Sequence, residues 1–167
     1  MRSRDYQAVR DIIVIVHNIR SMFNVGSIVR SAEGFGVSTV FTTGWTPSPD
    51  HGLPHVKQKL ASELQKTALG AEAMVNLQYK EDIIRLLNTL KRDGYRIVGL
   101  EQDAKSISLP DYQPPAKVAL LLGEEVDGIA PELLDKCDDL IEIPMFGHKE
   151  SFNVSVAAGI ALYQLTQ

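Results

Sequence analysis

The stretch NIRSMFNVGSIVRSAEGFG, residues 18–36, combines apolar residues at helical spacing with polar residues that suit ligand contact. At about 100° per residue, Gly26, Ser27, Glu33 and Gly34 all lie within about 60° of Arg30. Two glycines inside a helix cost about 1 kcal/mol each relative to alanine. Their presence favours close approach of another molecule to Arg30, whose planar guanidinium suits phosphate. Packing of a second helix, with Arg30 as an ordinary surface charge, explains this segment equally well.

Two further segments carry polar residues where a buried strand ends. The sequence LLLGEEVDGIAPELL, residues 120–134, passes from a strand into a turn with two glycines and acidic residues between them. The sequence IPMFGHKESFNVSVAAGIALYQL, residues 143–165, passes from a strand through Pro144 and Gly147 to Ser151, Asn153 and Ser155. Ser151 or Asn153 is suited to cap the last helix. Capping explains one of these polar residues but not three.

Several well-known catalytic and binding motifs are absent. There is no Gly-Lys pair of a phosphate-binding loop, no third glycine after GFG for a dinucleotide fingerprint, and no HExxH or GxSxG motif. His51 and His55 lie in a Pro/Gly-rich stretch, where solvated side chains are the simpler interpretation. Cys137 is the only cysteine, which excludes an internal disulfide and a cysteine-based metal site. We therefore expect no bound metal.

Strands and helices alternate along the chain, which predicts an α/β fold with a mainly parallel sheet and helices on both faces. The expected strands span residues 11–16, 38–43, 74–79, 95–101, 117–123 and 140–145, and the expected helices span residues 24–35, 80–94 and 153–166, with a short helix at Pro131. Residues 44–54 and 106–116 are predicted loops. Ligands of parallel sheets bind beyond the carboxyl ends of the strands. All three polar segments fall at such ends.

Length and composition set the broad class. The 167 residues suit one domain, here 1–167 with residues 1–10 as an N-terminal extension. No apolar run is long enough for a membrane span or a signal peptide, and the single cysteine agrees with a cytoplasmic location. The net charge is −4, but residues 1–66 hold eight Lys and Arg against five Asp and Glu. A nucleic-acid surface would therefore lie in that part of the chain, although chance explains the asymmetry as well.

Taken together, the three segments resemble the SpoU (TrmH-like) family of the SPOUT RNA methyltransferases. The family's first motif matches NVGSIVR, its Gly-x-Glu motif matches LLLGEE, and its Ile-Pro-Met to Ser-Leu-Asn-Val-Ser motif matches IPMFGHKESFNVSVA. Order and spacing agree over residues 11–167. Phe152 replaces the usual leucine, which should alter the shape of the pocket rather than the chemistry. The resemblance implies a 2′-O-ribose methyltransferase that uses S-adenosylmethionine, a C-terminal trefoil knot around the cofactor, and a homodimer.

The resemblance also assigns residues to roles. Its catalytic residues would be Arg30 and Asn24, with Ser151 and Asn153 arranging the substrate. Its cofactor-binding residues would be Leu100, Gly123, Glu124, Ile143, Met145 and Phe152. The tRNA or rRNA substrate would contact basic residues of the N-terminal half, namely Arg2, Arg4, Arg10, Arg20, Lys57, Lys59 and Lys66, although plain surface solvation explains most of these as well. The last helix is apolar almost all round, so it is buried either in the monomer core or against a partner chain.

Two questions stay open at this level. The first is how the ribose hydroxyl loses its proton. Arg30 is a poor base because a guanidinium has a pKa above about 12, so binding of phosphate and the nascent alkoxide by Arg30 is favoured over proton abstraction. The second is the activity itself. A silent RNA-binding module, an ordinary nucleotide-binding enzyme and a base-methylating SPOUT enzyme are the alternatives.

Overall fold

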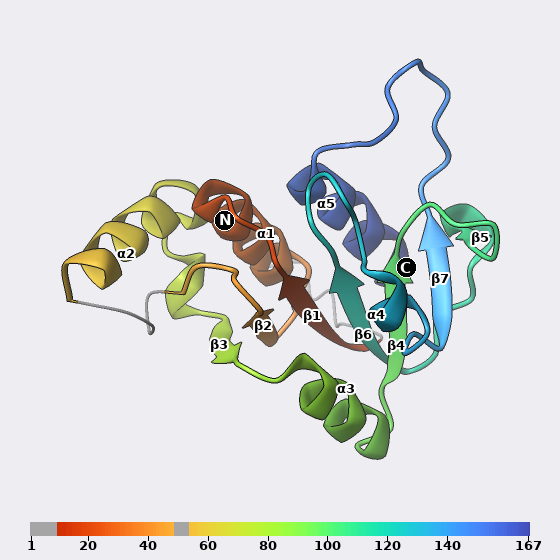
Figure 1. Ribbon diagram of the computed structural model, residues 1–167, viewed down its shortest axis with the longest axis horizontal. Coiled ribbons are helices and arrows are strands. Elements are labelled where there is room, and N and C mark those ends of the chain that lie inside the picture. Colours follow the sequence, from red (N-terminus) through yellow and green to blue (C-terminus); the bar gives the residue numbers. More distant parts are fainter. Residues whose placement is uncertain (1–9, 49–53) are drawn as a thin grey trace, which may run out of the picture.

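The computed structural model describes residues 10–48 and 54–167. Seven parallel strands form one sheet in the order β3-β2-β1-β6-β4-β7-β5 (Figure 1). The strands are β1 (Asp11–His17), β2 (Thr39–Thr43), β3 (Asn76–Lys80), β4 (Arg96–Leu100), β5 (Ile107–Ser108), β6 (Lys117–Leu122) and β7 (Asp139–Glu142). The helices are α1 (Met22–Gly34), α2 (Pro54–Ala68), α3 (Ile83–Arg92), α4 (Pro131–Leu134) and α5 (Val154–Leu165), and short 3-10 turns span Ala71–Ala73 and Leu109–Asp111. The predicted α/β class with a parallel sheet is confirmed.

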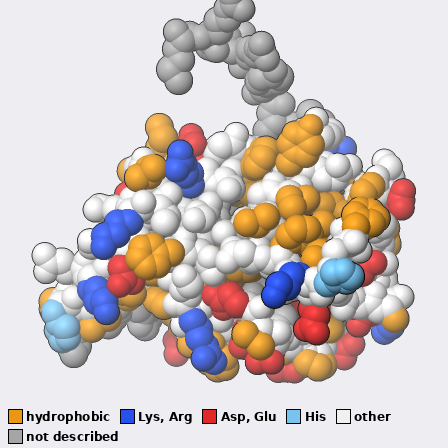
Figure 2. Space-filling model, turned by 90° about the horizontal axis from the view of Figure 1, so that it is seen from above, with side chains coloured by type: hydrophobic (Ala, Val, Ile, Leu, Met, Phe, Trp, Pro, Cys, Tyr) orange, Lys and Arg blue, Asp and Glu red, His pale blue; other side chains and the backbone are white. Residues whose placement is uncertain are grey.

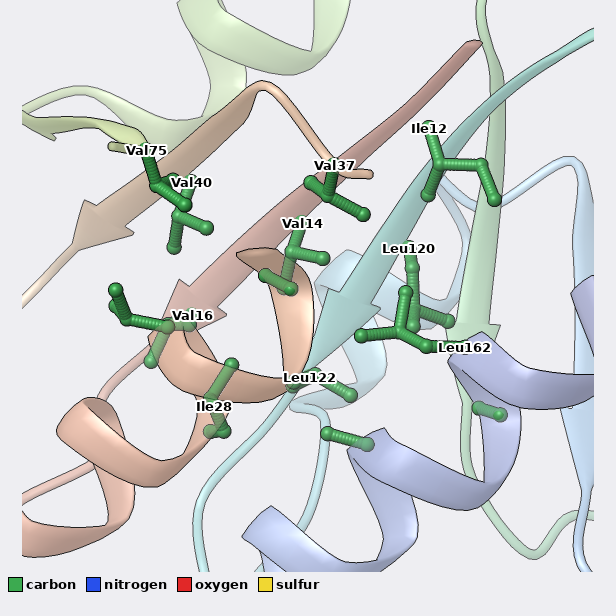
Figure 3. Close-up of a cluster of buried hydrophobic side chains, with 14 of the residues drawn as sticks. Ile12, Val14, Val16, Ile28, Val37, Val40, Val75, Leu120, Leu122 and Leu162 are labelled. Atoms are coloured by element: carbon green, nitrogen blue, oxygen red, sulfur yellow. The ribbon is translucent and has the colours of Figure 1, made fainter. Parts of the chain in front are cut away.

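Strands β1 and β6 pair at the centre of the sheet and are buried on both faces. Their side chains alternate between two cores, as the pleat of a strand requires. Val14, Val16 and Leu120 point to the face covered by α1 and α5 (Figure 3). Ile13, Ile15 and Leu121 point to the opposite face, which is covered by α3 and α4. The continuous apolar runs IIVIV and VALLL thus reflect burial on both sides.

Helix α2 was not among the predicted elements. Its mean hydropathy is low and only Leu64 and Ala68 are buried, so the helix packs on α1 rather than on the sheet (Figure 1). The predicted loop 106–116 contains the two-residue strand β5 and a 3-10 turn. Strand β7 ends at Glu142, so Ile143 and Met145 lie in the connection to α5 rather than in a strand. That connection projects away from the sheet (Figure 1).

Gly26 has a different role from the predicted one. A Cβ atom added there would lie 2.0 Å from Thr67 Oγ1 and 2.8 Å from the Leu64 carbonyl oxygen, both on α2. Gly26 therefore allows close packing of α1 against α2 and leaves no room for a ligand. Gly34 differs, since no atom lies within 4 Å of an added Cβ atom. The prediction of a bare face was wrong for Gly26 and holds for Gly34.

Candidate active site

A cavity of about 180 Å³ opens at the carboxyl edge of the sheet, among the segments that follow β4, β6 and β7. The parallel arrangement places β4 between β6 and β7, so these three segments meet although they are far apart in sequence. The cavity lining includes five of the six residues predicted to bind a cofactor, Leu100, Gly123, Glu124, Ile143 and Phe152, and also Ser151. Met145, the sixth, is not among the lining residues.

The segment after β6 forms a closed turn against the cavity. Glu124 and Gly128 exchange two main-chain hydrogen bonds, from Glu124 N to Gly128 O at 2.9 Å and from Gly128 N to Glu124 O at 3.1 Å. A Cβ atom on Gly123 would lie 2.3 Å from the Gly128 carbonyl oxygen, so only glycine fits there. The carboxylate of Glu101 accepts a hydrogen bond from Ile129 N at 2.8 Å and fixes the far end of the turn. The turn therefore presents main-chain groups at a fixed position.

Two glutamates connect this turn to the segment between β1 and α1. Glu124 Oε1 accepts a hydrogen bond from Asn18 Nδ2 at 3.2 Å. Glu125 Oε1 accepts one from Asn24 Nδ2 at 3.3 Å, and the same carboxylate accepts longer bonds from the main-chain nitrogens of Arg20 and Ser21. A carboxylate at the N-terminus of α1 is also favoured by the helix dipole. Sequence reasoning named Glu124 but missed Glu125, although the Gly-x-Glu spacing of the second motif points to it.

Three of the predicted site residues lie together. Asn153 Nδ2 donates to Asn24 Oδ1 at 3.3 Å, which joins the starts of α5 and α1. The other amide atom of Asn153 caps α5, because Oδ1 accepts from Ser155 N at 2.9 Å. The chain from Glu125 through Asn24 to Asn153 therefore borders the cavity, into which Ser151 also faces.

Arg30 lies apart from this group in its own chain. It is exposed on α1, about 9 Å along the helix axis from Asn24 at 1.5 Å per residue. It does not line the cavity, and its guanidinium has no hydrogen bond or ion pair within residues 10–48 and 54–167. The structure thus brings together the cofactor-binding and amide residues but not Arg30.

The residues predicted to contact RNA fall into two groups. Lys57, Lys59 and Lys66 lie on α2, and Arg20 is exposed directly after β1. Seen from the end toward which the strands point, Lys and Arg side chains are spread over the half that carries α2, while hydrophobic side chains gather in the other half (Figure 2). Arg10 belongs to neither group, since it lies at the opposite edge of the sheet and donates to the carbonyl oxygens of Pro114, Leu165 and Gln167. Arg10 therefore fixes the end of α5, and its position does not support a contact with RNA. Arg2 and Arg4 lie outside the described residues.

His17, at the end of β1, is a buried neighbour of this site. Burial lowers its pKa, and the nearby Glu124 carboxylate partly opposes the shift. Its Nδ1 lies 2.8 Å from Thr43 Oγ1. A neutral ring is therefore favoured, and His17 acts as part of the scaffold beneath the loop residues. No group of three or more His, Cys, Asp or Glu side chains in the described ranges is arranged to hold a metal ion.

A parallel α/β sheet with a cavity at its carboxyl edge defines a ligand-binding α/β protein. The model of the SpoU rRNA Methylase family matches residues 11–163, and the chain belongs to this family.

Three relatives describe the surroundings within that family. The chain is 28% identical over 155 residues to the tRNA (guanosine(18)-2′-O)-methyltransferase of Aquifex aeolicus, covering 93% of this chain and 68% of the relative. It is 32% identical to the 23S rRNA (guanosine-2′-O-)-methyltransferase RlmB of Xylella fastidiosa, covering 92% and 57%. The AdoMet-bound rRNA methyltransferase from Sinorhizobium meliloti superposes with a TM-score of 0.78 at 25% identity, covering 96% and 58%. The chain thus spans 57% to 68% of the length of these two curated relatives.

Proposed function

We propose that this protein transfers a methyl group from S-adenosylmethionine to a ribose 2′-hydroxyl of RNA, with tRNA or rRNA as the substrate class. The main support is the convergence of the predicted cofactor residues on one cavity that Glu125 joins to Asn24. Family membership and the printed activities of the two curated relatives point the same way. The cytoplasm, where such RNAs are modified, is the location we propose. In the part of the chain that the structure covers, every helix is too short or too polar to cross a bilayer.

The cavity suits the proposed cofactor chemically. Leu100, Ile143 and Phe152 supply apolar walls for an adenine ring, and the closed turn at Gly123 supplies main-chain donors and acceptors. Acidic side chains that line the cavity, Glu101, Glu124, Glu125, Asp127 and Glu142, suit a ligand with a sulfonium and an ammonium group. The volume of about 180 Å³ is below the roughly 300–1,000 Å³ of typical ligand pockets. The enclosed part therefore fits the nucleoside portion, with the remainder in the open mouth. From family membership we infer that the chain is knotted around this cavity.

The residues of the chain divide the remaining work. Bound S-adenosylmethionine would supply the methyl group on an activated sulfonium carbon. The ribose oxygen must lose its proton as it is methylated, and Asn24 and Asn153 offer amide groups to orient it. Arg30, with five donors in a plane, would bind the neighbouring phosphate and the developing negative charge on the oxygen. The proton would then pass to the phosphate or to water.

A homodimer would complete the site. Val156, Ile160 and Tyr163 are exposed apolar residues on one face of α5, at i, i+4 and i+7 spacing, beside α1. Such a face favours association with another chain. Because Arg30 does not reach the cavity of its own chain, we propose that it serves the cavity of the partner. Sedimentation of wild type and Ile160→Glu tests this, since the variant should become monomeric and lose methyl transfer together.

Methyl incorporation tests the function directly. Purified protein would be incubated with methyl-labelled S-adenosylmethionine and either unfractionated tRNA or rRNA, and the RNA digested to nucleosides. Label in a 2′-O-methyl nucleoside supports the proposal, whereas label in a methylated base supports the base-methylating alternative. Titration calorimetry with S-adenosylmethionine separates an enzyme from a silent RNA-binding module, which would show no binding. Mapping ribose methylation in cells that lack the protein would then identify the RNA.

A further inference from the structure

Trp45 is a large aromatic side chain that the proposed reaction leaves unused. It is the only tryptophan of the chain, and 60% of it is exposed. It follows β2 directly, at the same edge of the sheet as the cavity. Tryptophan is usually well buried in proteins, so an exposed one beside a ligand site indicates an interaction.

The main chain under Trp45 is held firmly. Trp45 N donates to Asn18 Oδ1 at 3.1 Å, and the preceding carbonyl of Gly44 accepts from Tyr79 OH at 3.0 Å. Thr46, the next residue, is buried and binds Val16 O and Ile19 N through its hydroxyl group. Gly44 has φ +63, and an added Cβ atom would lie 1.9 Å from Asn18 Oδ1. The indole is therefore carried by a rigid main chain and stays open to solvent.

Asn18 connects this position to the cavity. The same side chain that accepts from Trp45 N donates from Nδ2 to Glu124, a cavity-lining residue, at 3.2 Å. Trp45 is thus separated from the cavity wall by a single asparagine. Asn18 itself has φ 57, in the left-handed region that asparagine tolerates better than most residues.

The charges around Trp45 suit an anionic strand. Lys80 ends β3 and pairs in register with Thr43, two positions before Trp45, and Arg20 is exposed on the other side of Asn18. Of the acidic neighbours, Glu124 and Glu125 are engaged in the hydrogen bonds described above, and Glu81 next to Lys80 is exposed. A cation on either side of an exposed aromatic ring is the arrangement found in sites for single-stranded nucleic acid.

We propose that Trp45 stacks on an unpaired base of the RNA, next to the nucleotide whose ribose is methylated. This inference rests on the proposed function and specifies its substrate as a single-stranded or loop segment. Base-paired nucleotides have both faces covered by their neighbours in the helix, whereas an unpaired base offers a free face to an indole. Stacking tolerates any base, so Trp45 selects for exposed bases rather than for a sequence.

Intrinsic fluorescence tests this inference, because Trp45 is the only tryptophan. Unfractionated tRNA, which contains loops, should quench the emission in a saturable manner. A fully paired RNA duplex should bind more weakly and quench little. Emission that tRNA leaves unchanged at saturation, or that depends on protein concentration instead of RNA, would overturn the proposal and point to a protein contact.

Substitution gives a second, independent measurement. Trp45→Ala should weaken tRNA binding about tenfold, within the range measured for loss of one stacked base, while Trp45→Phe should recover part of it. Met74→Ala is the matched control, since Met74 is 76% exposed and lies at the start of β3, far from the carboxyl edge. Calorimetry should give wild-type affinity of Trp45→Ala for S-adenosylmethionine. A wild-type enzyme that methylates RNA, with Trp45→Ala binding tRNA as tightly as Met74→Ala, would refute the stacking role and leave the proposed function intact.

Discussion

Asn153 Nδ2 lies 3.3 Å from Asn24 Oδ1, although 129 positions separate the two residues in sequence. Ser21 caps α1 three residues before Asn24, and Asn153 itself caps α5. The bond therefore joins the N-terminal ends of two helices at the rim of the cavity. Helix N-termini carry partial positive charge, so this is a favourable place for the negative charge that develops on a ribose oxygen.

The first prediction separates the two roles of Asn153. Asn153→Asp keeps the oxygen that caps α5 but loses the amide donor to Asn24, whereas Asn153→Ala loses both. We expect Asn153→Asp to melt like wild type and to lose about tenfold or more in kcat for methyl transfer. Asn153→Ala should lose a similar factor in kcat and also about 1 kcal/mol of stability, the usual cost of removing a cap. Equal kcat for Asn153→Asp and wild type would show that the contact with Asn24 is only structural.

The second prediction concerns the guanidinium of Arg30. Arg30→Lys keeps the charge but loses the planar set of donors, so most of the methyl-transfer activity should disappear. Because Arg30 is exposed and makes no contact within residues 10–48 and 54–167, the variant should have an unchanged melting temperature. Arg92→Lys, at the exposed end of α3, serves as control and should keep wild-type activity. Near-normal turnover by Arg30→Lys would exclude a role for the planar group.

The third prediction uses the two glycines of α1. Gly26→Ala should destabilise the protein by about 1–3 kcal/mol, because the added methyl group overlaps α2. Gly34→Ala meets nothing within 4 Å and should be neutral or stabilising by up to about 1 kcal/mol, as helix propensity predicts. Urea unfolding of both variants measures the difference. A stable Gly26→Ala variant would contradict the close packing of α1 on α2.

The sequence predicted the sheet well because its central strands carry an unambiguous signal. Continuous apolar runs at Ile12–Val16 and Val118–Leu122 are typical of strands buried on both faces, and both occupy the centre of the sheet. Helix α2 was missed because its contact is a narrow one, with Leu64 and Ala68 against α1 and most of its other side chains in solvent. Strand β5 has only two residues, too few to produce any period.

The site was only partly accessible from sequence. Gly123 and Asn24 could be found from motif spacing, but their convergence depends on the strand order, which places β4 between β6 and β7. Glu101 and Asn18 act by bonding distant main-chain and side-chain atoms, and no local pattern marks such residues. The same holds for Arg10, whose charge suggested RNA but whose partners are the carbonyl oxygens near the end of α5. Charge alone does not distinguish a binding residue from a structural one.

The fourth prediction tests the closed turn as the cofactor site. Gly123→Ala places a methyl group 2.3 Å from the Gly128 carbonyl oxygen, so the turn must shift and the affinity for S-adenosylmethionine should fall at least tenfold. Gly147→Ala is the control, because no atom lies within 4 Å of its added Cβ atom. Titration calorimetry measures both variants, and circular dichroism confirms their fold. Unchanged affinity in a folded Gly123→Ala variant would place the cofactor elsewhere.

The fifth prediction concerns Asp139, at the start of β7. Arg96 donates to both carboxylate oxygens, from Nε at 2.5 Å and from Nη2 at 2.9 Å, and Tyr112 OH donates at 2.8 Å. The hydrogen bonds from Arg96 are the main reason that the pKa of Asp139 lies below its ordinary value of 3.8, while partial burial opposes the shift. In the unfolded chain the pKa returns to about 3.9.

A lowered pKa in the folded state fixes the sign of the pH dependence. The unfolded chain binds the proton first, so the stabilisation is complete above about pH 3.9 and is lost as the pH falls through the lower pKa of the folded state. Asp139→Asn should therefore reduce the free energy of unfolding by about 1 kcal/mol at pH 7, a modest value because half of the Arg96 side chain is exposed. The difference from wild type should shrink toward zero as the pH falls through that folded-state pKa. Asp135→Asn, at an exposed aspartate after α4, should show no such pH-dependent difference. Urea unfolding across this pH range measures both, and a pH-independent difference for Asp139→Asn would mean that shape rather than charge makes the contribution.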